Sequence, residues 1–401
     1  MVYQIRKKEF IYLIVFSVYI TALVLNSTLV DEYEPWGSLI QYMRYACYAA
    51  AILLILWEGF YERQFWIFAA AAVVTLLSVL GSDNMTFLFY FLLLLAGKDA
   101  NKRQILKLFL CIQGSIIALC VLFSSIGILP DYLYDPTTRV RHFLGFKWTA
   151  LGPIMFFFWM MVYIWLRGKK MRLAEYLILE GINAWFFYMT DARMSFYLSS
   201  AMLVYVFLMR FYWQNREDRI RKNRIFVLAP AVCCIFSVAI HLCYNEENET
   251  WAALNDFLSS RLYWGQSAAK EYGISLFGNS VEWIGYGIQE STGTYNYVDC
   301  GYMQILIENG ILFLILVVIL YTYMMYKAIE TRDFYLQTVL LFTLVLCITE
   351  PRLMNLAYNP FPVLSIGYFS LHGDQETYGL RRAAAVPFRF GNTRIGLKSR
   401  R

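Results

Sequence analysis

Apolar stretches long enough to cross a lipid bilayer recur along almost the whole of this 401-residue chain. A membrane-spanning α-helix needs roughly 20 predominantly apolar residues. Twelve candidate segments are present: 10–30, 38–57, 65–80, 85–97, 105–129, 150–166, 173–190, 193–210, 225–243, 301–326, 334–350 and 357–371. Only 16% of the residues are charged, compared with about 25% in soluble domains. The sequence therefore predicts an all-α, polytopic integral membrane protein with about twelve transmembrane helices, and counts of eleven or thirteen also fit.

The positions of Lys and Arg predict how these helices are oriented. With the N-terminus inside, the inner segments contain 27 of the 35 basic residues. Cytoplasmic loops of membrane proteins are enriched in Lys and Arg, so we expect both termini in the cytoplasm. The first apolar segment follows three basic residues and lacks a small-residue cleavage site, so we expect it to be retained.

The segments form one predicted membrane domain, residues 1–371, followed by a basic cytoplasmic tail, residues 372–401. Two outer loops are expected, a shorter one at 130–149 and a long one at 244–300. The long loop carries a net charge of −6. The simplest interpretation of the tail is a solvated segment held near anionic lipid.

Several classes of chemistry lack their sequence signatures. The chain contains no P-loop, HExxH or DxD pattern and only three histidines. We therefore expect no ATP hydrolysis, no metal site, no cofactor and no nucleic-acid partner.

Charged residues near the outer ends of the predicted helices are the strongest functional candidates, because such residues are costly at membrane depth. Arg193, in "DARMSFY", begins the eighth predicted helix, which Thr190 or Asp191 would cap. A helix N-terminus beside a guanidinium suits an anion such as phosphate. Alternatively, Arg193 extends to lipid headgroups or pairs with Asp191.

The long outer loop supplies a second arginine. Arg261 lies in segment 254–280, which we predict to be an amphipathic helix along the membrane surface, and it precedes Tyr263 and Trp264. Aromatic residues of this kind either lie at the interface or stack on sugars. The alternative is an interfacial helix with a solvated arginine.

Acidic candidates lie where this loop joins the tenth predicted helix. Asp299 is a candidate general base and also a candidate N-cap of this helix, and one residue can have both roles. Glu308 is nine residues further on, about 13 Å deeper, and needs a buried partner or a raised pKa. In the shorter loop, Arg141 and His142 either guide an anionic substrate or belong to a solvated segment.

The order and spacing of "DARMSFY", "LNDFLSSRLYWGQSAAKEYGISLFGNS" and "VDCGYMQILIENGIL" resemble the O-antigen polymerase and ligase superfamily, and most closely the Wzy-type polymerases of Gram-positive bacteria. The resemblance covers residues 137–360. "RHFLGF" also resembles a polymerase loop motif, although Lys147-Trp148-Thr149 replaces the usual His-Pro-Asn. Asp299-Cys300 replaces the His-Asn of the ligase branch, which favours a polymerase.

The resemblance implies a GT-C-like membrane glycosyltransferase in the bacterial cytoplasmic membrane, with its active site on the extracytoplasmic side. It would polymerise undecaprenyl-pyrophosphate-linked oligosaccharides into capsular or extracellular polysaccharide, alongside a chain-length regulator and a flippase. Arg193 and Arg261 would bind the pyrophosphate and Asp299 would be the base. Substrate-binding candidates are Arg141, His142, Tyr263, Trp264, Trp283, Tyr297 and Glu308.

Two other functions remain compatible with the sequence. A ligase would transfer finished glycan to another acceptor. A lipid-linked oligosaccharide flippase also has many helices, but a transporter would place charges at the bilayer midplane between broken helices. Here the distinctive charges cluster at one face.

Overall fold

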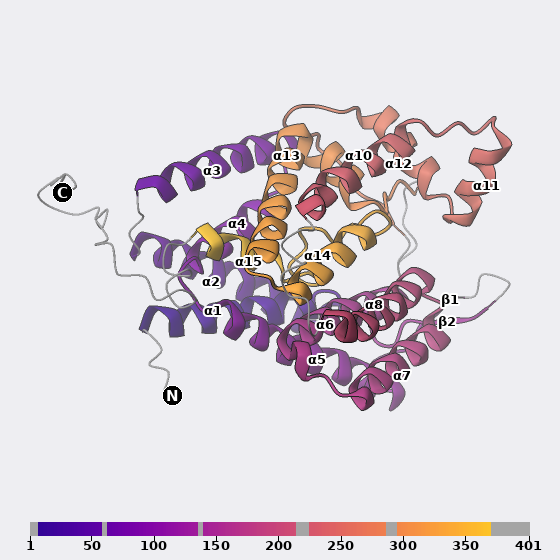
Figure 1. The fold of residues 1–401 in the computed structure, drawn as a ribbon, viewed down its shortest axis with the longest axis horizontal. Helices are drawn as coiled ribbons and strands as arrows, with labels where there is room; N and C mark the ends of the chain where they lie inside the picture. The colour runs from indigo at the N-terminus through magenta and orange to yellow at the C-terminus, as the bar shows by residue number, and fades with distance from the viewer. Residues whose placement is uncertain (1–6, 58–61, 135–138, 214–223, 286–294, 370–401) are drawn as a thin grey trace, which may run out of the picture.

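A computed structural model describes residues 7–57, 62–134, 139–213, 224–285 and 295–369, and the chain is mostly helical (Figure 1). The long helices are α1 (Lys7–Leu25), α2 (Trp36–Trp57), α3 (Glu62–Ser82), α5 (Lys102–Ser125), α6 (Leu151–Arg167), α7 (Leu173–Thr190), α8 (Arg193–Trp213), α10 (Ala229–Leu242) and α13 (Gly301–Glu330). The shorter elements are η1 (Leu29–Glu32), α4 (Thr86–Ala96), β1 (Leu133–Tyr134), β2 (Arg141–His142), η2 (Gly168–Lys170), η3 (Arg224–Leu228), α11 (Glu249–Phe257), α12 (Arg261–Tyr272), α14 (Phe334–Leu346) and α15 (Pro362–Phe369).

Each of the twelve predicted segments contains a helix, but not all of these helices are of membrane-spanning length. Within the described residues, seven are long and apolar enough to cross a bilayer: α1, α2, α3, α5, α6 with η2, α10 with η3, and α13. By contrast, α4 and α14 are apolar but only 11 and 13 residues long. The structure thus supports a helical, membrane-embedded protein, whereas the count of about twelve is not confirmed. The predicted tail, 372–401, lies outside the described residues.

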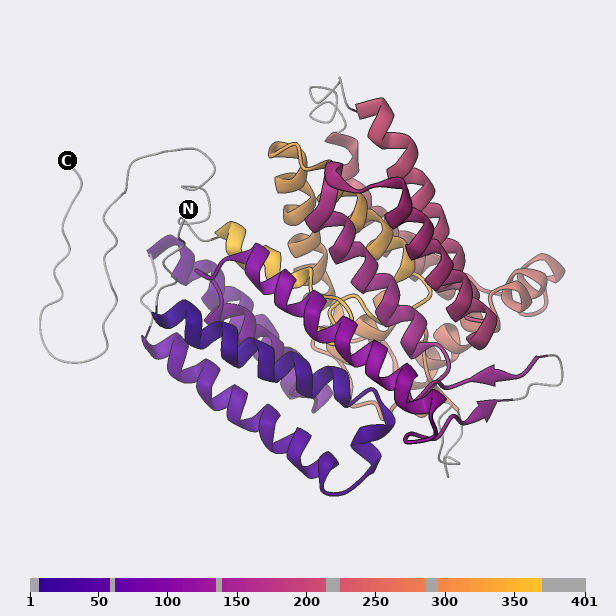
Figure 2. The ribbon, with the colours of Figure 1, turned by 90° about the horizontal axis from the view of Figure 1, so that it is seen from below.

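The core forms around α1, α6 and α13, which carry long runs of buried apolar side chains. Helix α1 packs against α2 and α5, α6 packs against α5 and α7, and α13 packs against α3, α10, α14 and α15. Figure 2 shows the helices running side by side between two ends of the molecule. Helix α13 therefore lies where the N-terminal helices meet the C-terminal ones.

One end of the bundle, which we call the basic face, carries most of the basic residues. Hydrogen bonds join helix ends there: Lys8 Nζ donates to Trp57 O, Arg103 Nη2 to Leu166 O and Trp165 Nε1 to Asp333 Oδ2. The inner segments predicted from charge, as far as they are described, meet at this face.

The other end, which we call the loop face, gathers the described parts of the longer connections: 26–35, 126–134 and 139–150, 243–285 and 295–300, and 347–361. Contacts join them in pairs, such as Lys147 Nζ to Asp31 Oδ2 at 2.6 Å and Arg261 Nη2 to Glu350 Oε1 at 3.4 Å. The β1–β2 hairpin and helices α11 and α12 project at this end in both views (Figures 1 and 2).

The long outer loop differs from the single amphipathic helix predicted for 254–280. Ser259 and Ser260 adopt positive φ of 56° and 62° and divide the segment into α11 and α12. Helix α12 then ends at Gly273, whose φ is 78°, a conformation that glycine adopts without steric cost. Beyond it the chain has no regular secondary structure as far as residue 285.

Candidate functional site

Two arginines and two carboxylates from three separate segments meet on the loop face. Arg261 Nε lies 3.4 Å from Asp299 Oδ2, and Arg261 Nη2 lies 3.4 Å from Glu350 Oε1. Arg352 is close enough for its charge to act on both carboxylates. We call Arg261, Asp299, Glu350 and Arg352 the charged cluster. The sequence predicted that Arg261 and Asp299 belong to one site, and the structure brings them together.

The turn between α11 and α12 positions Arg261. Asn255 Oδ1 accepts a hydrogen bond from Tyr263 N at 3.0 Å, and Asn255 O accepts one from Ser260 N at 2.8 Å. This single asparagine holds the two serines in left-handed conformations, which are unfavourable for residues other than glycine. Arg261 is therefore held at the start of α12, with its guanidinium directed to Asp299 and Glu350.

The 347–361 connection supplies Glu350 and Arg352. Asn359 Nδ2 donates to the carbonyl oxygens of Arg352 and Leu353 and to Tyr321 Oη. The Arg352 guanidinium also lies 4.4 Å above the ring of Tyr358, a cation–π arrangement. These contacts hold the loop against α13 and fix Arg352 beside the carboxylates.

Asp299 does not cap α13. The N-cap position belongs to Cys300, which makes no side-chain capping bond. Gly301 N instead donates to Cys347 O at 2.9 Å. The 347–361 connection therefore supplies the hydrogen-bond acceptor for this N–H group at the start of α13. The N-cap interpretation of Asp299 is therefore wrong, and its carboxylate is directed to Arg261.

Burial changes the protonation of both carboxyl groups in the charged cluster. Burial raises the pKa of Asp299 above its ordinary value, against the opposing charges of Arg261 and Arg352. Burial raises the pKa of Glu350 to about 7, with Asp299 adding to the increase and the arginines opposing it. The Glu350 side chain is 9% exposed and that of Asp299 31%. Asp299 is thus the more accessible of the two carboxyl groups.

A cavity of about 220 Å³ adjoins the charged cluster and shares Arg352 with it. Tyr297, Trp283 and Glu308 line it. The buried Glu308 carboxylate accepts hydrogen bonds from Asn84 Nδ2 at 2.6 Å and Trp283 Nε1 at 2.8 Å. The sequence predicted that Glu308 needs either a buried partner or a raised pKa, and Asn84 and Trp283 are such partners.

Helix α13 is interrupted at Gly310, and the irregular segment 275–279 packs against this interruption. Gly310 has φ 86° and ψ 170°. Three backbone hydrogen bonds join the two segments: Ile311 N to Ser275 O, Leu312 N to Leu276 O and Asn279 N to Glu308 O. The interruption thus satisfies the polar backbone of segment 275–279 and places Glu308 in the cavity wall.

Arg193 lies in a different group of charges. Asp191 is within 3.3 Å of the guanidinium nitrogens of Arg139, Arg141 and Arg193. We call these four residues the Asp191 cluster. One carboxylate faces three guanidinium groups, so the cluster is positively charged. In the described part of the chain, no ion pair or hydrogen bond joins it to the charged cluster, so the expected joint site of Arg193 and Arg261 is not formed by direct contact.

The prediction that Thr190 or Asp191 caps the N-terminus of α8 is wrong. Asp191 has φ 50° and follows α7 as its C-cap. The Thr190 hydroxyl donates to Phe186 O, within α7. Neither side chain caps α8, because both belong to the end of the preceding helix. The predicted pairing of Arg193 with Asp191 is the alternative that the structure confirms, and the Arg193 side chain is 68% exposed.

The other predicted substrate-binding residues divide between two places. His142 Nδ1 lies 2.5 Å from Asp131 Oδ2 at the hairpin, and Arg141 belongs to the Asp191 cluster. Trp264 packs edge-on against Tyr295 at 4.8 Å and against Tyr263 at 5.1 Å. Of the four aromatic candidates, Trp283 and Tyr297 line the cavity beside the charged cluster, whereas Tyr263 and Trp264 do not.

Glu350 and Arg352 are members of the charged cluster that the sequence interpretation missed. Glu350 is the last residue of the eleventh predicted apolar segment and Arg352 follows it, in "ITEPRLMN". Charged residues beside a proline at the end of an apolar run carry the same signal that identified Arg193, an ionisable group near membrane depth. Glu350 was instead assigned to the end of that segment.

No family model, curated protein or solved structure matches the chain.

Proposed function

We propose that this protein is a membrane glycosyltransferase that polymerises undecaprenyl-pyrophosphate-linked oligosaccharide repeat units into capsular or extracellular polysaccharide. The proposal rests on the resemblance of residues 137–360 to Wzy-type polymerases and on one structural observation. Arg261 and Asp299, which that resemblance assigns to the pyrophosphate and to the base, lie 3.4 Å apart beside a cavity.

The arginines of the charged cluster bind the donor pyrophosphate. A guanidinium offers several N–H donors in a planar fork that matches phosphate oxygens. Arg261 Nε is buried and donates no hydrogen bond within the described residues, and its contact with Asp299 is long at 3.4 Å. The pyrophosphate therefore replaces Asp299 as the partner of Arg261 and releases this carboxylate.

Asp299 then acts as the base. It takes the proton from an acceptor hydroxyl, whose oxygen forms a bond to the anomeric carbon of the donor glycan. The bond from that carbon to the pyrophosphate oxygen breaks, and the electron pair leaves with the lipid pyrophosphate. Arg261 and Arg352 stabilise the charge that develops on this oxygen. Attack opposite the leaving group inverts the anomeric centre.

The Asp191 cluster binds the second lipid-linked substrate. Its uncompensated positive charge and the 68% exposure of Arg193 suit an anionic headgroup at the surface. This assignment separates Arg193 from Arg261, so that each arginine group serves one of the two substrates. The loop face is then extracytoplasmic, the basic face is cytoplasmic, and the architecture is of the GT-C-like class.

The role of Arg261 is tested with purified protein in lipid nanodiscs and a lipid-linked repeat unit. Arg261→Ala should lower polymer formation by about 100-fold or more, as loss of a leaving-group donor does elsewhere. Arg261→Lys should restore part of the activity, because lysine supplies the charge without the fork. Lys270→Ala is the matched control, since Lys270 is exposed on the same helix. Full-length polymer from Arg261→Ala at the normal rate would remove the pyrophosphate role.

The reaction class is tested in a strain that lacks the gene. Single lipid-linked repeat units exposed on the outer face indicate a polymerase. Single units confined to the inner face indicate a flippase. Long polymer that is not attached to its acceptor indicates a ligase, so either of the last two results would overturn the proposal.

A further inference from the structure

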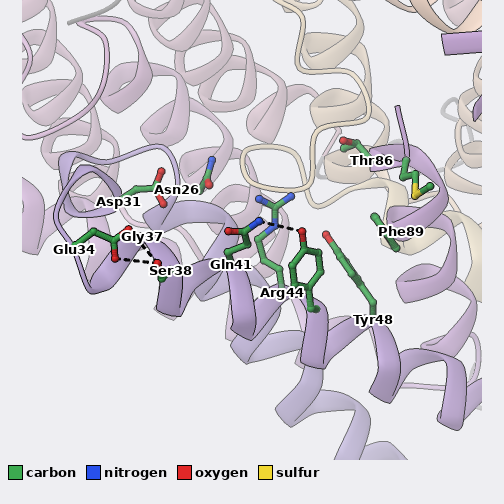
Figure 3. Close-up of a pocket in the computed structure, with 12 residues that line it drawn as sticks. Asn26, Asp31, Glu34, Gly37, Ser38, Gln41, Arg44, Tyr48, Thr86 and Phe89 are labelled. Carbon is green, nitrogen blue, oxygen red and sulfur yellow. Dashed lines mark hydrogen bonds between the residues drawn. The ribbon is translucent and has the colours of Figure 1, made fainter. Parts of the chain in front are cut away.

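A second and larger cavity of about 470 Å³ lies on the loop face, away from the charged cluster. Its walls come from the end of α1, from η1 and α2, and from the start of α4 (Figure 3). Its volume falls within the roughly 300–1,000 Å³ that is typical of ligand sites. Thr86 lines this cavity and also the smaller one that contains Arg352. The two cavities are therefore neighbours.

The lining of this larger cavity combines hydrogen-bond donors and acceptors of both charge types. Arg44, Asn26 and Gln41 offer N–H groups, and Figure 3 shows Arg44 and Gln41 projecting from α2 on the side where Asn26 lies. Asp31 and Glu34 offer carboxylate oxygens. A purely anionic ligand uses donors alone, and a purely cationic ligand uses acceptors alone. Hydroxyl groups both donate and accept, so the lining matches a hydroxyl-rich ligand.

Arg44 retains free donor capacity within the cavity. Its electrostatic neighbours are the tyrosines Tyr48, Tyr19 and Tyr90. Within the residues that the structure describes, no carboxylate lies at ion-pair distance from Arg44, and its Nε is buried without a hydrogen-bond partner. An arginine left in this state at membrane depth is expensive unless a ligand uses it.

The two carboxylates of the lining have partners within the protein but do not use all of their hydrogen-bond acceptor positions. Asp31 pairs with Lys147 through one oxygen, Oδ2, at 2.6 Å. Both oxygens of Glu34 accept from Ser38 Oγ, at 2.9 and 3.0 Å, and a carboxylate has about four acceptor positions. Each therefore keeps acceptor positions for a ligand hydroxyl.

The cavity also has an aromatic wall. The rings of Tyr48 and Phe89 stack at 3.7 Å with an interplanar angle of 4°, which holds both side chains in fixed orientations. Flat aromatic surfaces beside polar groups suit a ring that carries C–H groups on its faces and hydroxyls at its edge. A pyranose ring has this form.

We propose that this cavity binds sugar residues of the lipid-linked glycan, at a distance from its pyrophosphate. The source of the glycan rests on the proposed polymerase function, whereas saccharide binding by the cavity is measurable independently. The smaller cavity and the charged cluster receive the reducing end, and the larger cavity receives sugars further along the chain.

The kinetic test compares three α2 variants in nanodiscs. Ser38→Trp fills the cavity and Arg44→Met removes the free donor, and each should raise the KM for the lipid-linked unit about tenfold and shorten the polymer, with kcat retained. Tyr42→Leu is the matched control, because Tyr42 lies on the same helix, is 69% exposed and does not line the cavity. Gln41→Leu is a milder variant should Ser38→Trp fail to fold.

The binding test uses size-fractionated oligosaccharides from an acid hydrolysate of the strain's own extracellular polysaccharide. They are added to the full chain in an Asp299→Asn background, so that no turnover occurs. Fragments should raise the melting temperature, because a ligand that binds the folded state stabilises it, and Ser38→Trp should remove this shift. Inorganic pyrophosphate serves as the anion probe.

The outcomes separate the two proposals. If the wild-type protein makes no polymer but fragments still bind through the cavity, the polymerase function fails and the saccharide site stands. If polymer is made and the cavity variants match Tyr42→Leu in KM, polymer length and fragment binding, the saccharide site is overturned. Stabilisation by pyrophosphate that depends on Arg44, without any by fragments, also overturns it in favour of an anion site.

Discussion

The charged cluster balances two guanidinium groups against two carboxyl groups, so the protonation of one residue sets its net charge. The pKa of Glu350 is about 7, and a proton on Glu350 therefore leaves the cluster positive near neutral pH. A positive cluster attracts a pyrophosphate more strongly than a neutral one. Asp299 is more exposed and next to Arg261, which suits a base. In the proposed mechanism, Glu350 therefore adjusts substrate binding and Asp299 performs the proton transfer.

Glu350→Gln tests this division of roles. In the wild-type protein the KM for the lipid-linked donor should increase between pH 6 and pH 8, because Glu350 ionises there and adds negative charge. Glutamine cannot ionise, so the variant should keep its pH 6 value of KM throughout. A KM that increases equally in both proteins would show that another group titrates.

The same substitution has a stability consequence. The pKa of Glu350 is raised in the folded state, so its proton stabilises the fold at low pH and this contribution is lost as the pH increases through about 7. The melting temperature of Glu350→Gln should therefore change less between pH 5 and pH 8 than that of the wild-type protein.

At the scale of elements, the interruption of α13 explains how an irregular segment reaches the site. Non-helical backbone at membrane depth is tolerated where protein buries it. Segment 273–279 lies between α3 and α13, since a Cβ on Gly81 of α3 would approach Phe277 O within 2.5 Å. Its hydrogen bonds go to the residues on either side of Gly310. The interrupted helix and the irregular segment therefore depend on each other.

Gly310→Ala should disrupt this arrangement. The new Cβ would lie 2.4 Å from Gly278 N and 2.6 Å from Leu276 O, at φ 86°. The combination of φ 86° and ψ 170° is adopted almost only by glycine and costs about 1–3 kcal/mol for other residues. Overlap with fixed backbone adds to this cost. We expect a lower melting temperature in detergent and reduced polymer formation.

Gly181→Ala is the control for this substitution. Gly181 lies within α7, and its Cβ would meet nothing within 4 Å. Alanine is the better helix former by about 1 kcal/mol, so this variant should be as stable as the wild-type protein or slightly more so. Equal melting temperatures for the two alanine variants would mean that segment 273–279 does not depend on Gly310.

At the scale of the whole molecule, the recurring apolar stretches were sufficient to predict the helical class and a helix within each of the twelve segments, because these depend on local composition. They did not predict the division of the long outer loop into α11 and α12. They also could not predict that the 347–361 connection lies against the start of α13, since this follows from how α13, α14 and α15 pack. The sequence therefore did not place Glu350 and Arg352 beside Asp299. The same limit applies to the Asp191 cluster, because Asp191 pairs with Arg139 and Arg141, which are about 50 residues away along the chain.

The orientation of the whole molecule is the remaining prediction, and it decides where the chemistry occurs. The basic face contains Lys169, and the loop face contains Asn245, both exposed. In a Cys243→Ser background, which removes the exposed cysteine of the loop face, Asn245→Cys should react with a membrane-impermeant maleimide in intact cells. Lys169→Cys should react only after permeabilisation, because cytoplasmic loops are the basic ones. The reverse labelling pattern would place the charged cluster in the cytoplasm, away from flipped lipid-linked repeat units, and the proposed polymerase would then have no substrate at its site.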